Sequence, residues 1–563
     1  MWSGPLQGTL CLAWRRIYRR EKMEELMPTA NKPSRTTNEF DLEYDVVVVG
    51  YGYAGGISAI VAADNGAKVL LIEKASVPGG ISICSYGALR CAADPELAFQ
   101  YLKETNAGRT PDDVIRALAD GMCEMETYVR ELVKVSGAVV TTTEDYGKGA
   151  NYPLTGYKTF YHTNVELPTF NARETYPWAN GAPGGPVTFK VVEDNLKIRK
   201  VDVMLETEAL RLISREAGET QEVLGVTIRT KEKEIKRVKA RHGVILCTGG
   251  FEGNREYREQ FWEGMPVNPC CGQSNTGDGI RMAQDLGAKL WHMWHFHGCY
   301  GFTHPDPSYP YMIRVKRLPD WTPTHEHEAK VKMAWILLDQ SGQRYMNEYQ
   351  PYTQDTTHRP LHYFDPATQK YPRNPSFLIC DESGRKMYAL GRPTSNDKGV
   401  YMNWSDDNLR EVELGILKQA DTIAELAQKL GMDAAAAERS IARWNELCAK
   451  AADDDFGRPA GTMAPVKTGP FYGAPVGAIV TNTQGGPAHN AKQQIVDHFG
   501  DAIPRLYAAG EMGSSFGHLY MSGSNITECF VNGRIAGREV MAVQPWDAVD
   551  AKQRKTLRQV EFA

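Results

Sequence analysis

A strand–turn–helix–strand pattern over residues 44–73 constrains the fold of this chain more than any other feature. The valine-rich run 45–49 predicts a parallel strand that is buried on both faces, and the apolar run 68–72 predicts a second one. Between them lies the turn G-x-G-x-x-G, which consists of Gly50, Gly52 and Gly55. These glycines permit a tight turn, let a pyrophosphate approach the following helix, and let that helix lie close to the strand. The pattern predicts a dinucleotide-binding site.

The acidic residue that ends the pattern supports the same prediction. Glu73 stands at the tip of the second strand, 21 residues after Gly52, where a carboxylate can accept hydrogen bonds from both hydroxyls of an adenosine ribose. A glycine motif alone is weak evidence. Here both strands, the helix and the acid are in register, so we expect a nucleotide-binding site rather than a fortuitous glycine turn.

The same design returns later in the chain. The segment 242–254, HGVILCTGGFEGN, is an apolar strand that ends in glycines, and a last strand at 506–509 precedes a Gly-Glu pair and a helix that opens near Asn525. Strands so far apart in sequence predict an α/β fold, in which a discontinuous Rossmann-type domain brackets an inserted α+β cap domain. We expect a disordered or non-native extension at 1–40, the nucleotide domain at 41–297 and 468–545, the cap at 298–467, and a tail at 546–563.

Composition excludes several other classes. With 563 residues the chain is too long for one core, and its net charge of −5 with an isoelectric point near 6.3 argues against nucleic acid or an anionic membrane surface as partner. No run approaches the ~18 apolar residues of a membrane span. The eleven cysteines show no C-x-x-C spacing, which favours a soluble protein of the reducing cytoplasm. The vicinal pair Cys270 and Cys271 is expected to be inert.

Histidines cluster in two places, but neither cluster predicts a metal site. His292, His295 and His297 have no carboxylate or cysteine partner at ligand spacing, so we expect them to pack at the domain junction, with one of them within reach of the substrate pocket. His325 and His327 are expected on a solvated face.

Several motifs together resemble one family of flavoenzymes. They are the opening fingerprint, GG-x-S at 79–82, CTGGFEGN, NTGDG, GQRYMNE at 342–348, and AAGE followed by a helix that ends NGRIAG. This set resembles the fumarate reductase and 3-ketosteroid dehydrogenase family of FAD enzymes over nearly all of residues 44–542. The resemblance implies that FAD occupies the bracketing domain and that the cap closes substrate against the isoalloxazine. It implies noncovalent FAD, because residues 82–86 contain no histidine for covalent attachment.

The motifs and the resemblance together define the predicted cofactor site. Its residues are Gly50, Gly52, Tyr53, Ala54, Gly55, Glu73, Lys74, Gly80, Ser82, Thr248, Gly249, Gly250, Asp278, Gly510, Glu511, Ser524, Asn525 and Ile526.

The branches of this family differ at the catalytic positions. The arginine and histidine with which fumarate reductases bind a dicarboxylate align with Met521 and Asn482, so the sequence indicates a site without the cations that a dicarboxylate needs. The segment NEYQPY instead presents Tyr352, as a ketosteroid dehydrogenase presents its catalytic tyrosine. GHLYMSG offers Tyr520 for the ketone oxygen, with Ser522 nearby. The pairing of Tyr520 with Ser522 resembles the Δ4-(5α) type in particular, while GH-x-Y also resembles the Δ1 type, so the sequence does not choose between them.

These residues imply an oxidoreductase that introduces or removes a carbon–carbon double bond next to a ketone. Tyr520 would donate to the ketone, Tyr352 would take the α-proton, and the flavin would exchange the hydride. We expect a hydrophobic, steroid-like substrate and a separate electron acceptor or donor. The aromatic run 298–321 suits a flat apolar ligand, and a protein interface almost as well. Two alternatives stay open: a reductase of α,β-unsaturated acids or enones, and a flavin-binding protein whose cap is an interaction surface.

Overall fold

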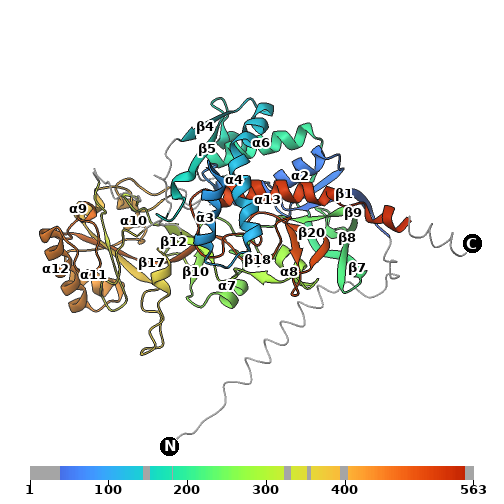
Figure 1. The fold of residues 1–563 in the computed structure, drawn as a ribbon. Helices are drawn as coiled ribbons and strands as arrows, with labels where there is room; N and C mark the ends of the chain where they lie inside the picture. The colour runs from blue at the N-terminus through green and yellow to red at the C-terminus, as the bar shows by residue number, and fades with distance from the viewer. Residues whose placement is uncertain are drawn as a thin grey trace, which may run out of the picture. The chain divides into compact units, whose positions relative to one another are not determined.

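The valine-rich strand expected from the sequence, β1 (Leu42–Val49), lies at the centre of a sheet in the computed structural model (Figure 1). The structure describes residues 39–143, 152–179, 182–321, 331–350, 355, 357–392 and 403–551. Strand β1 pairs in parallel with β2 (Val69–Ile72) on one side and with β9 (Ile235–Leu246) on the other. The side chains of residues 46–48 are fully buried, as a strand covered on both faces requires.

This first sheet brings the two ends of the described chain together. Within the described residues it has eight strands, six of them in the order β19-β20-β9-β1-β2-β6, while β7 and β8 form an antiparallel extension from β9. Its other members are β6 (Asp202–Met204), β7 (Glu208–Ala217), β8 (Thr220–Arg229), β19 (Gln494–Val496) and β20 (Ala502–Ala508). Because β20 pairs in parallel with β9, the C-terminal segment completes the sheet that the N-terminal segment begins.

Helices cover one face of this sheet (Figure 1). Helix α2 (Tyr53–Asp64) follows β1 directly and packs against α6 (Gly184–Ile198) and α13 (Ser524–Glu539). Nine of its twelve residues are buried, since it lies between the sheet and the other helices. The same layer contains α3 (Pro95–Asn106), α4 (Asp112–Leu132), and a small sheet of β3 (Leu89–Ala92), β4 (Val139–Thr143) and β5 (Phe160–Glu166).

A second sheet lies beside the first. In the described part of the chain it has seven strands, centred on the long strand β17 (Phe471–Thr483). The others are β10 (Val267–Pro269), β12 (Phe296–Thr303), β13 (Met312–Arg314), β14 (Ile336–Leu338), β15 (Ser376–Asp381) and β16 (Lys418–Ala420). Since β10 and β17 come from segments that flank residues 298–467, the cap domain with those bounds stays a proposal.

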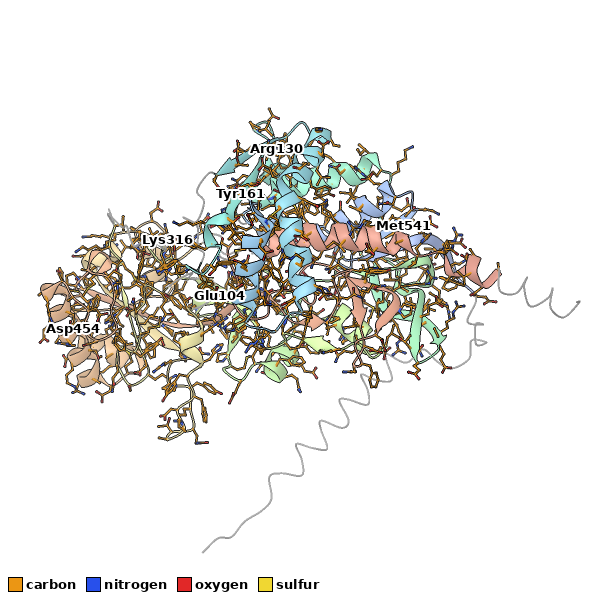
Figure 2. All side chains as sticks on the ribbon, viewed as in Figure 1. Glu104, Arg130, Tyr161, Lys316, Asp454 and Met541 are labelled. Carbon is orange, nitrogen blue, oxygen red and sulfur yellow. The ribbon has the colours of Figure 1, made fainter. Side chains whose placement is uncertain are left out.

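Two amphipathic helices pack on this second sheet. Helix α12 (Ala434–Lys450) starts where the Asp433 side chain accepts a hydrogen bond from the N–H of Ala436, and it buries apolar residues at helical spacing on the helix face that it turns to the sheet. Helix α11 (Ile423–Leu430) packs beside it. Figure 2 shows their side chains together with the labelled Asp454, which follows α12, and the labelled Met541, which follows α13. We propose that the helical second half of the insert is scaffold.

Shorter elements complete the described chain: α5 (Ala172–Thr175), α7 (Arg255–Phe261), α8 (Asp278–Gln284), α9 (Glu382–Arg385), α10 (Leu409–Glu413), β11 (Leu290–Trp291) and β18 (Gly486–Pro487). None of the helices in the ranges that the structure describes is both long enough and apolar enough to cross a bilayer.

Candidate active site

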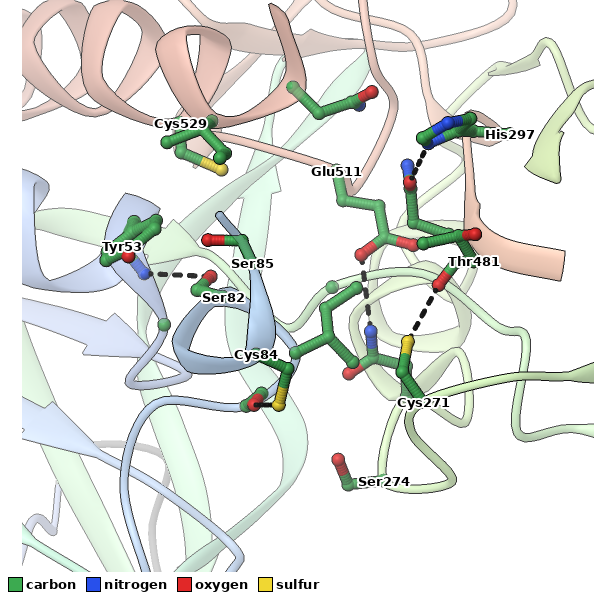
Figure 3. A pocket seen from close by; sticks show the side chains of 18 of the residues that line it. Tyr53, Ser82, Cys84, Ser85, Cys271, Ser274, His297, Thr481, Glu511 and Cys529 are labelled. Carbon is green, nitrogen blue, oxygen red and sulfur yellow. Dashed lines mark hydrogen bonds between the residues drawn. The ribbon is translucent and has the colours of Figure 1, made fainter. Parts of the chain in front are cut away.

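A cavity of about 1190 Å³ extends from the glycine turn after β1 to the second sheet. Fourteen of the residues predicted to bind the cofactor line it: Gly50, Gly52, Tyr53, Ala54, Glu73, Lys74, Gly80, Ser82, Thr248, Gly249, Asp278, Glu511, Asn525 and Ile526. Figure 3 shows Tyr53 and Ser82 on one side of the cavity and Thr481 and Glu511 on the other. The structure therefore brings together segments that are hundreds of residues apart in sequence.

The turn after β1 has the geometry that its glycines were expected to permit. Gly50 has φ +104°, and a Cβ on it would lie 2.3 Å from the carbonyl oxygen of Cys247. A Cβ on Gly55 would lie 1.8 Å from the carbonyl oxygen of Gly50, so a side chain at either position would disrupt the turn. At Gly52 the nearest atom to such a Cβ would be Ser82 Oγ at 3.0 Å. Both residues line the cavity beside the N-terminus of α2, and we call this glycine turn with Ser82 the cradle, where a phosphate can approach the helix.

The polar residues at the tips of the strands are held in place by backbone contacts. The Glu73 carboxylate accepts the N–H of Tyr51 and the N–H of Ala75, both at 2.9 Å, and still lines the cavity. Lys74 forms an ion pair with Asp278 at the N-terminus of α8. Although burial opposes it, Lys74 holds the pKa of Asp278 below its usual range. A fixed carboxylate and a fixed ion pair can thus orient a bound nucleotide.

Four of the predicted cofactor residues are not among those that line the cavity: Gly55, Gly250, Gly510 and Ser524. The glycines instead permit close packing. A Cβ on Gly250 would lie 1.7 Å from Thr483 Oγ1, and a Cβ on Gly510 would lie 2.8 Å from the Cβ of Ala54. Ser524 is the fully buried first residue of α13. We propose that these four act on the cofactor through packing.

Tyr520 lines the cavity, and only 4% of its surface is exposed to solvent. Its hydroxyl accepts the N–H of Asn525 at 3.3 Å, and its ring lies 4.2 Å from the ring of His297. His297 donates from Nδ1 to Asn482 Oδ1 at 2.8 Å, and burial lowers its pKa to about 4. His297 is therefore neutral at physiological pH. It is the histidine that reaches the pocket, as one of the three was expected to do.

A buried carboxylate fixes the backbone of this tyrosine. Asp355 accepts the N–H of Tyr520 at 3.0 Å, the hydroxyl of Tyr152, and a proton of His295 Nε2 at 3.4 Å. Burial alone would raise its pKa, but the hydrogen bond from His295 and the charge of Arg359 hold the pKa well below the usual range. Asp355 follows Tyr352 by three positions in the sequence. Tyr352 itself lies outside the described residues.

Two carboxyl groups share a buried pocket at the edge of the cavity. Asn275 Nδ2 lies 2.7 Å from Glu252 Oε1 and 3.2 Å from Glu511 Oε2, so its amide bridges them. Thr483 donates its N–H to Glu511 at 2.8 Å. Burial, with the repulsion between the two carboxyl groups, raises the pKa of Glu252 well above its usual range, and burial raises that of Glu511 to about 7. At least one of the pair is protonated at neutral pH.

The expectation of a site without cations is wrong. Met521 is buried in the hydrophobic core, and Asn482 is hydrogen-bonded to His297, so neither position supplies a cation, as the sequence indicated. However, three cations besides Lys74 line the cavity: Arg314, Lys316 and Arg392. They come from the second sheet and its loops, where the sequence offered no family motif to mark them.

Sequence reasoning missed other lining residues as well. These include His162, Cys270, Cys271, Thr481 and Trp404. The two cysteines are adjacent in the sequence, but nothing local in the sequence places them beside β17. Among the described residues no cluster of histidine, cysteine and acidic side chains could hold a metal ion.

Comparison with known proteins identifies the family. Residues 45–526 match the model of the FAD binding domain family, and the chain belongs to that family. It is 27% identical to a 3-oxosteroid 1-dehydrogenase of Mycolicibacterium smegmatis, over 89% of this chain and 97% of the relative. It is also 27% identical to a fumarate reductase (cytochrome) of Shewanella frigidimarina, over 92% of this chain and 80% of the relative. These relatives are the two branches that the sequence motifs resemble.

Solved structures show the same fold. A 3-ketosteroid Δ1-dehydrogenase of Sterolibacterium denitrificans, in complex with 1,4-androstadiene-3,17-dione, superposes with a TM-score of 0.72 at 21% identity, over 89% of this chain and 99% of that one. The predicted family, the α/β fold class and FAD as cofactor are confirmed. The glycine cradle, the fixed Glu73 carboxylate and the volume of the cavity fit FAD. The protein is an FAD-dependent oxidoreductase.

We expect the FAD to be released by acid or heat. Residues 82–86 offer no histidine for covalent attachment. Acid precipitation of purified protein should leave the yellow cofactor in the supernatant, where its absorbance measures it. Flavin that stays with the precipitate would contradict this expectation, and peptide mapping would then show which residue carries it.

Proposed function

We propose that this enzyme introduces or removes a carbon–carbon double bond conjugated to a ketone, on a 3-ketosteroid or a similarly bulky cyclic enone. The observation that carries the proposal is the buried hydroxyl of Tyr520 in the wall of the cavity, held by the N–H of Asn525 and by the packing of His297. The 3-oxosteroid 1-dehydrogenase relative supports it, since the chain matches nearly all of that protein.

Tyr520 provides the acid for the ketone oxygen in this proposal. Its hydroxyl accepts a hydrogen bond from the N–H of Asn525, and a hydroxyl that accepts one bond is a stronger donor in the next. Donation to the carbonyl stabilises the enolate as charge develops, which contributes ~3 kcal/mol in comparable oxyanion sites. Burial raises the pKa of Tyr520 far above its ordinary value, so the hydroxyl is protonated at neutral pH and can donate to the ketone oxygen. Ser522 lines the cavity beside it and assists.

The α-proton and the hydride need separate acceptors. Bound FAD supplies the hydride chemistry, and the chain must hold the substrate, exclude water and move the α-proton. We assign the proton to Tyr352, which belongs to the same sequence segment as Asp355. A free tyrosine titrates near ~10, so Tyr352 needs a polarising neighbour to act as a base.

A second candidate function is the reduction of an α,β-unsaturated acid or enone with electrons from a partner. One observation favours it: Arg314 lines the cavity and can bind an anionic group of a substrate. Anaerobic bleaching of the flavin absorbance, scanned over 3-ketosteroids and short unsaturated acids, distinguishes the two. Bleaching by a saturated 3-ketosteroid supports the first proposal, while reoxidation of reduced enzyme by unsaturated acids alone supports the second.

We expect fumarate and succinate to be neither substrates nor tight ligands. Where the resemblance predicts an arginine and a histidine, this chain has Met521 in the apolar core and Asn482 bonded to His297. Arg314, Lys316 and Arg392 line the cavity, but none of them stands at the two positions where the resemblance places the residues that bind a dicarboxylate. We therefore expect at least one carboxylate of fumarate to stay unpaired in a closed site, which costs several kcal/mol. Steady-state reduction of fumarate by the dithionite-reduced enzyme measures this directly. Turnover of fumarate at the rate of the best enone would exclude the ketosteroid assignment.

A further inference from the structure

Two cysteines that the proposed reaction does not use line the cavity. Cys270 and Cys271 follow β10, and both sulfurs contact one residue of β17. Cys270 Sγ lies 3.5 Å from Thr481 Oγ1, and Cys271 Sγ lies 3.3 Å from the Thr481 carbonyl oxygen. Neighbouring side chains of a regular strand point to opposite faces, whereas these two sulfurs share one wall of the cavity. Figure 3 shows Cys271 there, bonded to Thr481.

An arginine lies beside this pair. Arg314, at the end of β13, donates from Nη2 to Thr481 Oγ1 at 2.7 Å and lies 3.8 Å from Cys270 Sγ. Within the described residues, it forms no ion pair with a carboxylate, and the sulfurs of Cys299, Cys270 and Cys271 are the neighbouring groups whose charge acts most on its guanidinium. A cation at this distance favours a thiolate over a thiol.

Cys271 and Arg314 both lower the pKa of Cys270. The hydrogen bond from Cys271 lowers the pKa of Cys270 to about 6, burial opposes this, and the charge of Arg314 adds to it. Cys299, which faces the pair from β12, has its pKa raised to about 11 by burial and stays neutral. The pKa of Cys271 is raised by its bond to Cys270, so this thiol keeps its proton.

We propose that Cys270 is a nucleophilic thiolate in the cavity wall and a site of covalent modification by α,β-unsaturated carbonyl compounds. The Cys270 Sγ electron pair attacks the β-carbon and forms a carbon–sulfur bond. The π pair of the double bond moves toward the carbonyl as an enolate, and the α-carbon then takes a proton from water. One thiol adds across one double bond, so the step needs no oxidant or reductant, and loss of the α-proton reverses it. This reactivity does not depend on the proposed hydride chemistry.

The other cysteines provide internal controls. Cys123 on α4 and Cys448 on α12 are more exposed than Cys270, but burial raises the pKa of each to about 11. Reactivity that follows exposure would modify these two first. Reactivity that follows the thiolate would modify Cys270 first, despite its position inside the cavity.

The test treats the FAD-loaded enzyme with a limiting amount of N-ethylmaleimide near pH ~7 and maps the adducts by mass spectrometry. We expect Cys270 to react at least ~10-fold faster than Cys123 and Cys448, with a rate that reaches half its plateau near pH ~6. Cys270→Ser should remove the fast phase and retain FAD. Arg314→Met should slow it by about tenfold and move the midpoint to higher pH.

Two results would overturn the proposal. One is an adduct on Cys123 or Cys448 while Cys270 stays unmodified, and the other is a rate at Cys270 that still rises at pH ~9, as for an ordinary thiol. Should Arg314→Met fail to fold, Cys271→Ala provides the second measurement, because it removes the hydrogen bond that contributes most to the lowered pKa of Cys270. A midpoint unchanged in Cys271→Ala would equally refute an activated thiolate.

Discussion

Replacing Tyr520 with phenylalanine should lower kcat by about 10²-fold or more, while folding and FAD content stay at the wild-type level. The substitution keeps the ring that packs on His297 and removes the hydroxyl that would donate to the ketone. Stopped-flow reduction of the flavin by substrate measures the rate, and the ratio of absorbance at the flavin and protein bands measures FAD content. Binding of ketone product analogues should weaken in parallel, since the same donor holds the product oxygen.

A matched control makes this result specific. Tyr300 on β12 is also fully buried, but it packs in the core and is absent from the lining of the cavity. Tyr300→Phe should therefore leave kcat within about twofold of wild type, because it removes a hydroxyl of the same kind away from the cavity. Ser522→Ala should have an intermediate effect. If Tyr520→Phe and Tyr300→Phe have the same kcat, Tyr520 is a packing residue, and the ketosteroid proposal no longer has a residue that donates a proton to the ketone oxygen.

Tyr352→Phe tests the other half of the same mechanism. Loss of the proton acceptor should cost about 10²- to 10⁴-fold in kcat and change the pH profile. With substrate deuterated at the α-carbon, the Tyr352→Phe variant should show a larger isotope effect or lose α-proton exchange. Tyr520→Phe should retain exchange and weaken ketone binding. Near-normal kcat in both variants would exclude this pair of roles.

Replacing Gly52 with valine should abolish FAD binding. The position lies at the N-terminus of α2 and lines the cavity, and already a Cβ would come within 3.0 Å of Ser82 Oγ. The branched side chain would fill the space that the pyrophosphate needs. The protein should be purified colourless and should bind added FAD at least ~10³-fold more weakly, because the phosphate contacts are charge-assisted hydrogen bonds.

The opposite end of the same helix supplies the control for Gly52. Gly66 follows α2, and a Cβ there would meet no atom within 4 Å. Gly66→Ala should lower stability slightly, since its φ of +88° disfavours a side chain, and should keep the bound FAD. A Gly52→Val protein that is purified yellow would contradict the placement of the pyrophosphate at this turn.

Sequence alone predicted the parts of this molecule that depend on local patterns. Strand β1, the glycine turn and Glu73 all lie within residues 42–73, so the apolar pattern, the glycine spacing and the position of the acid can be read from one short segment. Motifs shared with the family then gave the fold and the cofactor. Most of the predicted cofactor residues line the cavity, and the few that do not are glycines and a serine where the backbone packs closely.

The remaining part of the site depends on contacts that no local pattern encodes. Arg314 stands in an aromatic run that suggested an apolar pocket, and only the pairing of β13 with β12 brings it to the cavity wall. Asp355 looks like an ordinary loop acid in the sequence. Its role as an acceptor for the backbone of Tyr520 follows from tertiary structure alone.

The partners of Asp355 also indicate the order in which the enzyme assembles. Its contacts join positions separated by 203 residues for Tyr152, 165 for Tyr520 and 60 for His295. Contacts between distant positions close large loops and form late, whereas the glycine turn and its flanking strands are local and can form early. We therefore expect the glycine turn and its flanking strands to form before the contacts of Asp355. The complete cofactor site also needs Thr248, Asp278 and Glu511, so a partly refolded molecule that has only the turn should not yet bind flavin.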